Sequence, residues 1–109
     1  MPSIYKVLGQ SNPSAATPTT LYTVPSANST IVSTVNVCNQ TNSPASYRIA
    51  VRPAGASLVS QHYIAYDSQV SGNDSISLTL GMTLSNTDVI TVQANTATVS
   101  FTAFGTEIY

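Results

Sequence analysis

The feature that most constrains the fold of this chain is an alternation of apolar and polar residues with a period of two. Between residues 75 and 80, for example, Ile76, Leu78 and Leu80 alternate with hydroxyl-bearing residues. This period is typical of β-strands that bury one face, and no stretch with helical period and helix caps competes with it. The alternation predicts strands at residues 4–8, 20–24, 30–38, 46–52, 62–67, 75–80, 88–94 and 97–104.

Turn-forming residues separate these segments and define the fold class. We predict an all-β chain, a single-domain antiparallel β-sandwich or small jelly roll of about eight strands. At 109 residues, the domain spans residues 1–109. Residues 9–20 contain two prolines and no charge, so we expect a surface loop or arm without regular strand pairing there. The turn signals are Asn12-Pro13 with Pro18, Pro25 with Asn28, Asn39 to Pro44, Pro53 to Gly55, Gly72 to Asp74, and Asn86.

The alternation also predicts which side chains form the core. In the strand at 46–52 the odd-numbered residues point inward, which places Arg48 and Arg52 together on the opposite face. Burying a large aliphatic side chain stabilises a fold by roughly 1.5–3 kcal/mol, so these positions should dominate its stability. The predicted inward-facing residues are Ile31, Val35, Val37, Tyr47, Ile49, Val51, Ile76, Leu78, Leu80, Ile90, Val92, Val99, Phe101 and Ala103.

Arg48 and Arg52 stand out because the chain has only three cations. In a monomer, the two arginines would simply form the polar side of a strand. Alternatively, they act as paired donors to carboxylates or carbonyls across a subunit interface, where arginine is enriched. Asp67, Glu107 or acids of a partner would then be the acceptors.

The scarcity of charge excludes several classes of partner. Three cations are too few to neutralise a row of phosphates or an anionic membrane, so we predict neither nucleic-acid nor membrane binding. Ser and Thr make up 31 of the 109 residues and replace charges on the surface. A formal net charge of −1 protects weakly against association. We therefore expect the protein to bind other copies of itself as a homo-oligomer.

Reactive groups are sparse, and no enzyme, metal or cofactor site is predicted. Cys38 is the single cysteine, so no intrachain disulfide can form. His62 is the single histidine, the acids are too scattered for a calcium loop, and no glycine motif for phosphate is present. The start MPSIYKVLG lacks signal-peptide features, and no apolar run reaches about 18 residues. These observations favour synthesis in a reducing cytoplasm.

The segment HYIAYD, residues 62–67, raises the question of sugar binding. Tyr63 and Tyr66 could stack on a carbohydrate, but regular alternation places them on opposite faces of a strand. One would then belong to the core and the other to the surface or an interface. His62 is interpreted as a structural or interface residue. The candidate interface residues are Arg48, Arg52, His62, Tyr63 and Tyr66.

Several segments together resemble a known group of proteins. These are YKVLGQ at 5–10, TTLYTVPSANSTIVSTVNVCN at 19–39, YRIAVRPAG at 47–55, QHYIAYDSQVSGNDS at 61–75 and FGTEI at 104–108. As a set they are similar to small virion structural proteins of tailed phages, often phages of cyanobacteria. The resemblance covers nearly the whole chain. It implies a non-enzymatic component of the virion. Because accessory virion proteins commonly sit on threefold or quasi-threefold positions, the resemblance also implies that the homo-oligomer is a trimer.

Composition and resemblance together define the expected role. Within the virion we expect a capsid decoration (cement) protein that stabilises the shell and binds the major capsid protein. The alternative is a neck, tail, baseplate or fibre-associated component that binds tail proteins, including a host-surface glycan-binding module. A free enzyme such as a glycan depolymerase has little support, because no catalytic motif is present.

Overall fold

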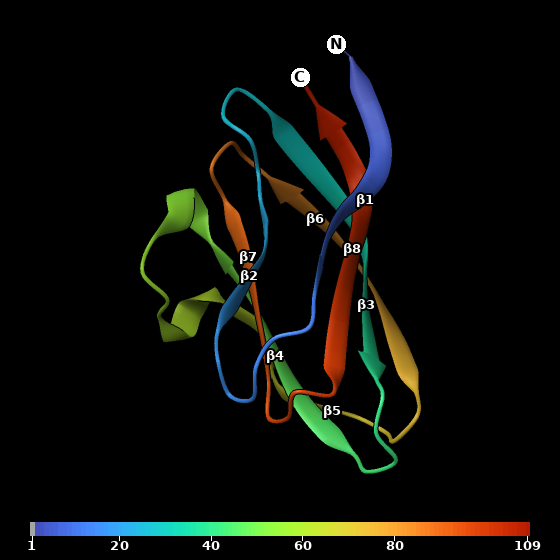
Figure 1. Cartoon of the computed structure of the whole chain (residues 1–109). Coiled ribbons are helices and arrows are strands. Elements are labelled where there is room, and N and C mark those ends of the chain that lie inside the picture. Colours follow the sequence, from blue (N-terminus) through green and yellow to red (C-terminus); the bar gives the residue numbers. More distant parts are fainter. Residues whose placement is uncertain (1) are drawn as a thin grey trace.

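The protein folds into two antiparallel four-stranded sheets in a computed structural model that describes residues 2–109 (Figure 1). Sheet 1 has the strand order β1-β8-β3-β6 and sheet 2 has the order β2-β7-β4-β5. Two short 3-10 turns, Pro53–Gly55 and Ser60–His62, join β4 to β5. The strands are β1 (Ser3–Ser11), β2 (Thr19–Thr23), β3 (Ser29–Asn39), β4 (Ala45–Arg52), β5 (Tyr63–Val70), β6 (Ser75–Leu84), β7 (Val89–Ala94) and β8 (Val99–Ile108).

The predicted β-sandwich of eight strands is confirmed, and all eight predicted segments form strands. The strand ends differ in places. The last strand begins at Val99 and continues to Ile108, and β5 begins at Tyr63 because Ser60–His62 forms a turn. Both termini lie at the same end of the sandwich, since β1 and β8 are antiparallel neighbours (Figure 1).

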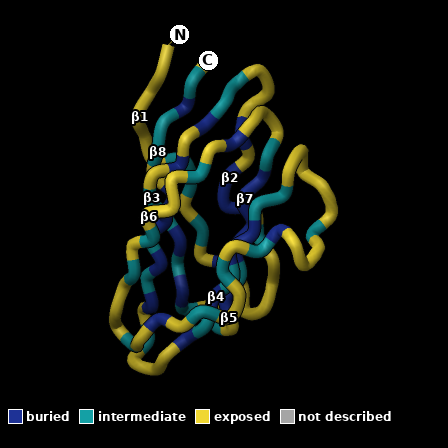
Figure 2. Tube along the Cα trace, turned by 180° about the vertical axis from the view of Figure 1, so that it is seen from behind, coloured by how far each residue is buried: buried dark blue, intermediate teal, exposed yellow. Residues whose placement is uncertain are grey.

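The core lies between the two sheets, where their apolar faces meet (Figure 2). Phe101 of sheet 1 packs edge-on against Tyr47 of sheet 2, with ring centroids 6.3 Å apart. Most of the predicted inward positions are confirmed, and Val51, Ile76 and Leu78 pack against the core while remaining partly exposed. The confirmed buried residues are Val35, Val37, Tyr47, Ile49, Ile90, Val92, Val99, Phe101 and Ala103.

Two core predictions are wrong, and a β-bulge explains both. Ile31 and Leu80 are 43% and 41% exposed, whereas Val32 is buried. Pairing of β3 with both neighbours shifts between Val32 and Thr34, so the inward positions change from even to odd numbers there. In β3 the irregularity reverses the alternation on which the prediction depends. In β6, Leu80 lies within the irregularity, opposite the break in β3 pairing, and turns outward although the inward positions on both sides of it are even-numbered.

The predicted loop at 9–20 is shorter in the structure. β1 continues to Ser11 along β8, and β2 begins at Thr19, so the connection spans only residues 12–18. Asn12 Nδ2 donates to the carbonyls of Ala97 and Val99, at 3.0 and 2.8 Å. The Ala16 amide donates to the Ala94 carbonyl at 2.7 Å. The connection is therefore fixed to its own domain.

Candidate functional site

Three of the five predicted site residues, Arg48, Tyr63 and Tyr66, lie together on β4 and β5 in sheet 2. Arg48 points outward from β4, because its neighbours Tyr47 and Ile49 are buried in the core. Its guanidinium group forms a two-point contact with Asp67 of β5, Nε to Oδ1 at 2.7 Å and Nη2 to Oδ2 at 3.3 Å. Hydrogen bonding from Arg48 holds the pKa of the Asp67 carboxyl below its usual value. Arg48 thus has an acceptor in its own chain.

Tyr63 and Tyr66 also join this group, although regular alternation predicted opposite faces. Their ring centroids are 5.0 Å apart at an interplanar angle of 83°. The pairing of β5 with β4 shifts twice along these residues, and Asp67 adopts a left-handed backbone with φ of 53°. These bulges bring both rings to one side. The Arg48 Cζ atom lies 4.0 Å from the Tyr66 ring centroid, a cation–π distance.

Arg52 and His62 have partners in their own chain. Arg52 Nε donates to Thr91 Oγ1 at 3.0 Å, and Nη1 donates to the carbonyls of Gly55 and Ala56 at 3.2 and 2.9 Å. The buried His62 accepts the Val59 amide at Nδ1, at 3.2 Å. These contacts favour structural roles in the β4–β5 connection over the interface roles considered from the sequence.

Arg52→Ala is therefore expected to destabilise the isolated protein. Loss of three hydrogen bonds from a charged, partly exposed donor should lower the free energy of unfolding by about 1–3 kcal/mol. Arg52→Lys should restore little of the lost stability, because an ammonium group cannot reproduce the planar, forked set of donors of a guanidinium group. Urea denaturation measures the effect, with Thr23→Ala on the exposed surface of β2 as a control. An unchanged midpoint in Arg52→Ala would show that these contacts contribute nothing.

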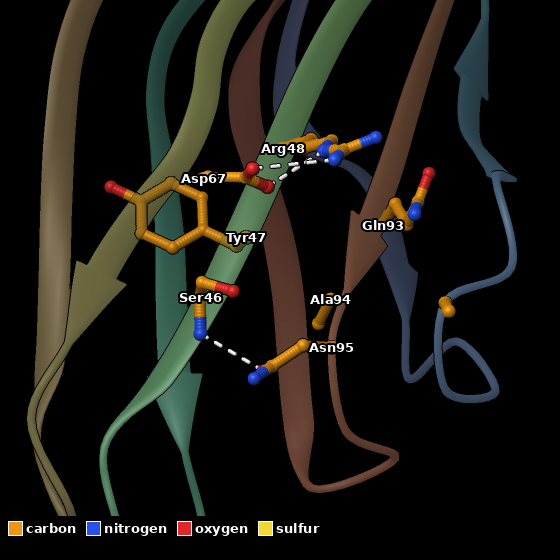
Figure 3. Close-up of a pocket in the computed structure, with 8 residues that line it drawn as sticks. Ser46, Tyr47, Arg48, Asp67, Gln93, Ala94 and Asn95 are labelled. Atoms are coloured by element: carbon orange, nitrogen blue, oxygen red, sulfur yellow. Dashed lines mark hydrogen bonds and ion pairs between the residues drawn. The ribbon is translucent and has the colours of Figure 1, made fainter.

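A hollow of about 150 Å³ lies beside Arg48 on the outside of sheet 2 (Figure 3). Asn95 lies at the end of the hollow, where its Oδ1 accepts the Ser46 amide at 2.9 Å. Gln93 of β7 pairs directly with Arg48 of β4, so the two side chains share one face of the sheet. More of the surface of the hollow is apolar than polar, although five of its eight lining residues are polar or charged. The lining residues are Ala16, Ser46, Tyr47, Arg48, Asp67, Gln93, Ala94 and Asn95.

The outer face of sheet 1 has a different character, because within residues 2–109 none of its outward strand positions carries a formal charge. Lys6 of the edge strand β1 lines a hollow there, together with Tyr5 and Phe104. Strand pairing defines the outward positions, since directly paired residues share a face. We call this surface the uncharged face. Its residues are Ser3, Tyr5, Val7 and Gln10 of β1, Ser100, Thr102, Phe104, Thr106 and Ile108 of β8, Ile31, Thr34, Asn36 and Cys38 of β3, and Ser75, Ser77, Thr79 and Thr83 of β6.

Four apolar side chains gather in one half of the uncharged face. Tyr5 is 86% exposed, and Val7, Ile31 and Phe104 are 40–47% exposed. Tyr5 and Ile31 flank Thr106 in one row of paired residues, and Val7 pairs with Phe104 in the next row. This patch was not predicted from the sequence. The alternation in IYKVL was its only local signal, because Tyr5 and Val7 fall on the face opposite Ile4 and Leu8.

A buried carboxylate links the two sheets and was also missed. Glu107 of β8 is only 6% exposed. It accepts hydrogen bonds from Tyr22 Oη at 2.6 Å and Lys6 Nζ at 3.2 Å, and Tyr22 Oη also contacts Thr30 Oγ1 at 2.8 Å. The hydrogen bond from Tyr22 keeps the pKa of Glu107 below its usual value, while burial raises the pKa of Tyr22 to about 12. Because Tyr22 belongs to sheet 2, this network ties the sheets together.

Within residues 2–109, no three acidic, histidine or cysteine side chains gather in a way that could hold a metal ion. The described chain also contains no helix with the length and apolarity needed to cross a membrane. The uncharged face and the hollow beside Arg48 are the two surfaces set out above. No family model and no curated protein matches the sequence, so the function must be inferred from these two surfaces.

Proposed function

We propose that this chain is a non-enzymatic virion structural protein of a tailed bacteriophage, a capsid decoration protein that attaches through its uncharged face. The observation that carries this proposal is a four-stranded face whose outward strand positions, among the described residues, carry no formal charge and which also exposes four apolar side chains, Tyr5, Val7, Ile31 and Phe104. The resemblance to small virion proteins supports the proposal that the chain belongs to a phage virion. The uncharged face supports the proposal that the chain acts by attaching to other virion proteins.

Such a surface suits attachment because it can be dehydrated at low cost. Charged side chains are depleted from the centres of interfaces, and aromatic side chains are enriched there. Removing hydroxyl groups from water costs far less than removing unpaired charges. Exposed apolar patches of this kind mark interaction sites on soluble proteins. The patch thus provides the anchoring contacts, and the surrounding Ser, Thr and Asn side chains provide hydrogen bonds at its rim.

The size of the face is also suitable. Four strands about 4.8 Å apart and about nine residues long cover roughly 600 Å². A standard specific interface takes about 800 Å² from each partner, so the face and its edges supply most of one. The proposed partners are other copies of the chain, arranged as trimers, and the major capsid protein. A neck, tail or fibre position would use the same face against tail proteins, and copy number per particle separates the two.

The proposal is tested by replacing the two aromatic residues of the patch. The double variant Tyr5→Ser with Phe104→Ser should bind particles at least about 30-fold more weakly, the effect of losing a central anchor residue worth about 2 kcal/mol. Retention on purified particles in gradient sedimentation measures this, and analytical ultracentrifugation measures self-association. The thermal midpoint should change little, because both side chains are exposed.

Tyr66→Ser is the matched control, since it removes an exposed aromatic side chain from the opposite sheet. It should bind particles like the parent. Equal binding by the double variant and the parent would exclude the uncharged face as the attachment surface. Failure of all forms to bind particles or one another would contradict the virion assignment itself.

A further inference from the structure

We propose that the hollow beside Arg48 binds a single neutral sugar ring, held by the Arg48–Asp67 pair together with Gln93 and Asn95. The hollow lies on sheet 2, whereas the uncharged face is the outer surface of sheet 1. This inference goes beyond the attachment function and does not depend on it.

The first support is the hydrogen-bonding capacity that the side chains retain. Nε and Nη2 of Arg48 engage Asp67, which leaves Nη1, and Figure 3 shows this outer nitrogen pointing away from Asp67. Asn95 uses its Oδ1 for the Ser46 amide and keeps its two Nδ2 donors. Within residues 2–109, the Gln93 amide has no protein hydrogen-bond partner, although it lines the hollow. Donors and acceptors thus face the same small space.

The second support is the charge balance, which selects a neutral ligand. Arg48 and Asp67 cancel each other, and among the described residues none of the others that line the hollow is charged. A phosphate or carboxylate would have to compete with Asp67 for the guanidinium group. A sugar hydroxyl both donates and accepts, so adjacent hydroxyls can bridge the carboxylate oxygens and the amide or guanidinium donors. The ion pair can remain intact when a sugar binds.

The third support is that three of the four side chains, Arg48, Asp67 and Asn95, are held in place before any ligand arrives. Arg48 is fixed by the two-point contact with Asp67 and lies 4.0 Å from the centroid of the Tyr66 ring. Asn95 is oriented by the Ser46 amide. Preorganised donors lose little conformational freedom on binding. A volume of about 150 Å³ corresponds to about five water molecules at ~30 Å³ each, which suits one sugar ring and not a longer chain.

An open site of this size should bind weakly as a single copy. We expect a dissociation constant of about 1–10 mM for a monosaccharide. Several copies held together in any multivalent form would multiply this affinity through avidity on a polysaccharide surface. The chemical class of ligand is therefore a neutral hexose or N-acetylhexosamine within a larger glycan.

Nuclear magnetic resonance titration of the full ¹⁵N-labelled chain tests the inference. The probes are glucose, galactose, mannose and N-acetylglucosamine, each raised above about 10 mM, with sodium sulfate as the anionic probe. At least one sugar should produce saturable shifts confined to the amides and side chains of Ser46, Arg48, Asp67, Gln93 and Asn95. Absence of such shifts with all four sugars, or a response to sulfate alone, would overturn the proposal.

Two variants make the result specific. Gln93→Ala should weaken sugar binding about tenfold, the effect of losing one hydrogen bond worth about 1.4 kcal/mol. Its thermal midpoint should not move, because the Gln93 amide bonds to no protein group. Gln40→Ala is the control, since Gln40 contacts Ser100 on sheet 1 and should bind sugar normally. If Gln93→Ala bound sugar like the parent, the assigned site would be wrong.

The double variant at Tyr5 and Phe104 separates this inference from the proposed attachment function. It should retain the sugar response while losing particle binding, because the two surfaces belong to different sheets. Loss of the sugar response in this folded variant would place the sugar on the uncharged face and overturn the assignment to the hollow.

Discussion

Phe101→Ala is expected to lower the free energy of unfolding by about 3–5 kcal/mol, the usual cost of deleting a buried phenyl ring. Phe101 is 0% exposed and packs edge-on against Tyr47 of the other sheet. Truncation removes this contact and leaves a cavity at the centre of the sandwich. For a domain of about 100 residues, each kcal/mol lowers the thermal midpoint by roughly 4–8 °C. Calorimetry and urea denaturation measure the two quantities.

Phe104→Ala is the matched control on the same strand. Phe104 lies three residues further along β8 and points to the uncharged face, where it is 40% exposed. Its truncation should cost about 1 kcal/mol or less, because partial exposure leaves little transfer free energy to lose. Similar losses of stability in the two variants would contradict the assignment of inward and outward faces along β8.

Glu107→Ala is expected to cause the second large loss of stability, lowering the free energy of unfolding by about 2–4 kcal/mol. The substitution removes the acceptor of two hydrogen bonds and leaves the buried Tyr22 hydroxyl with only Thr30 as a partner. The cost at Lys6 is smaller, because that side chain is 46% exposed and can be solvated. Tyr22→Phe provides a second measurement, since it deletes only the hydroxyl that joins sheet 2 to Glu107. A loss below about 0.5 kcal/mol in both variants would show that the network does not stabilise the sandwich.

The same network predicts a distinctive dependence of stability on pH. The pKa of Glu107 in the fold is lowered below 4.5, so its contribution is present above that value and is lost as the pH falls through the folded-state pKa. Tyr22 has the opposite sign. Its pKa rises from 10.0 to about 12, so its contribution is complete below pH 10 and is lost as the pH rises toward about 12.

Denaturation midpoints measured across this pH range test both signs. Glu107→Gln should flatten the acidic side of the stability profile, and Tyr22→Phe should flatten the alkaline side. Asp67→Asn is the acidic comparison, because the pKa of Asp67 is also lowered but its carboxylate lies at the surface. A parent profile that is flat at both extremes would contradict the buried carboxylate–tyrosine contact.

Local alternation was sufficient to predict the eight strands, most of the core and the placement of Arg48 and Arg52 on one outward face. These features depend on the backbone pleat, which sends successive side chains to opposite sides. The pattern in YRIAVR, with Tyr47 and Ile49 buried and Arg48 outward, therefore persists in the fold. The scarcity of charge was equally visible, although its distribution between the two sheets was not.

The sequence by itself thus determined the all-β class, the strand positions and the low charge of this protein. Tertiary structure alone decided which residues meet across strands. A bulge reverses the alternation of side chains beyond it, and the position of the bulge depends on pairing with a distant strand. For this reason Ile31 in β3 is exposed, and Tyr63 contacts Tyr66 in β5. Glu107 contacts Tyr22, which lies 85 residues away in the sequence, and Arg48 contacts Asp67, which lies 19 residues away. Such contacts follow from sheet order and register, which local patterns do not encode.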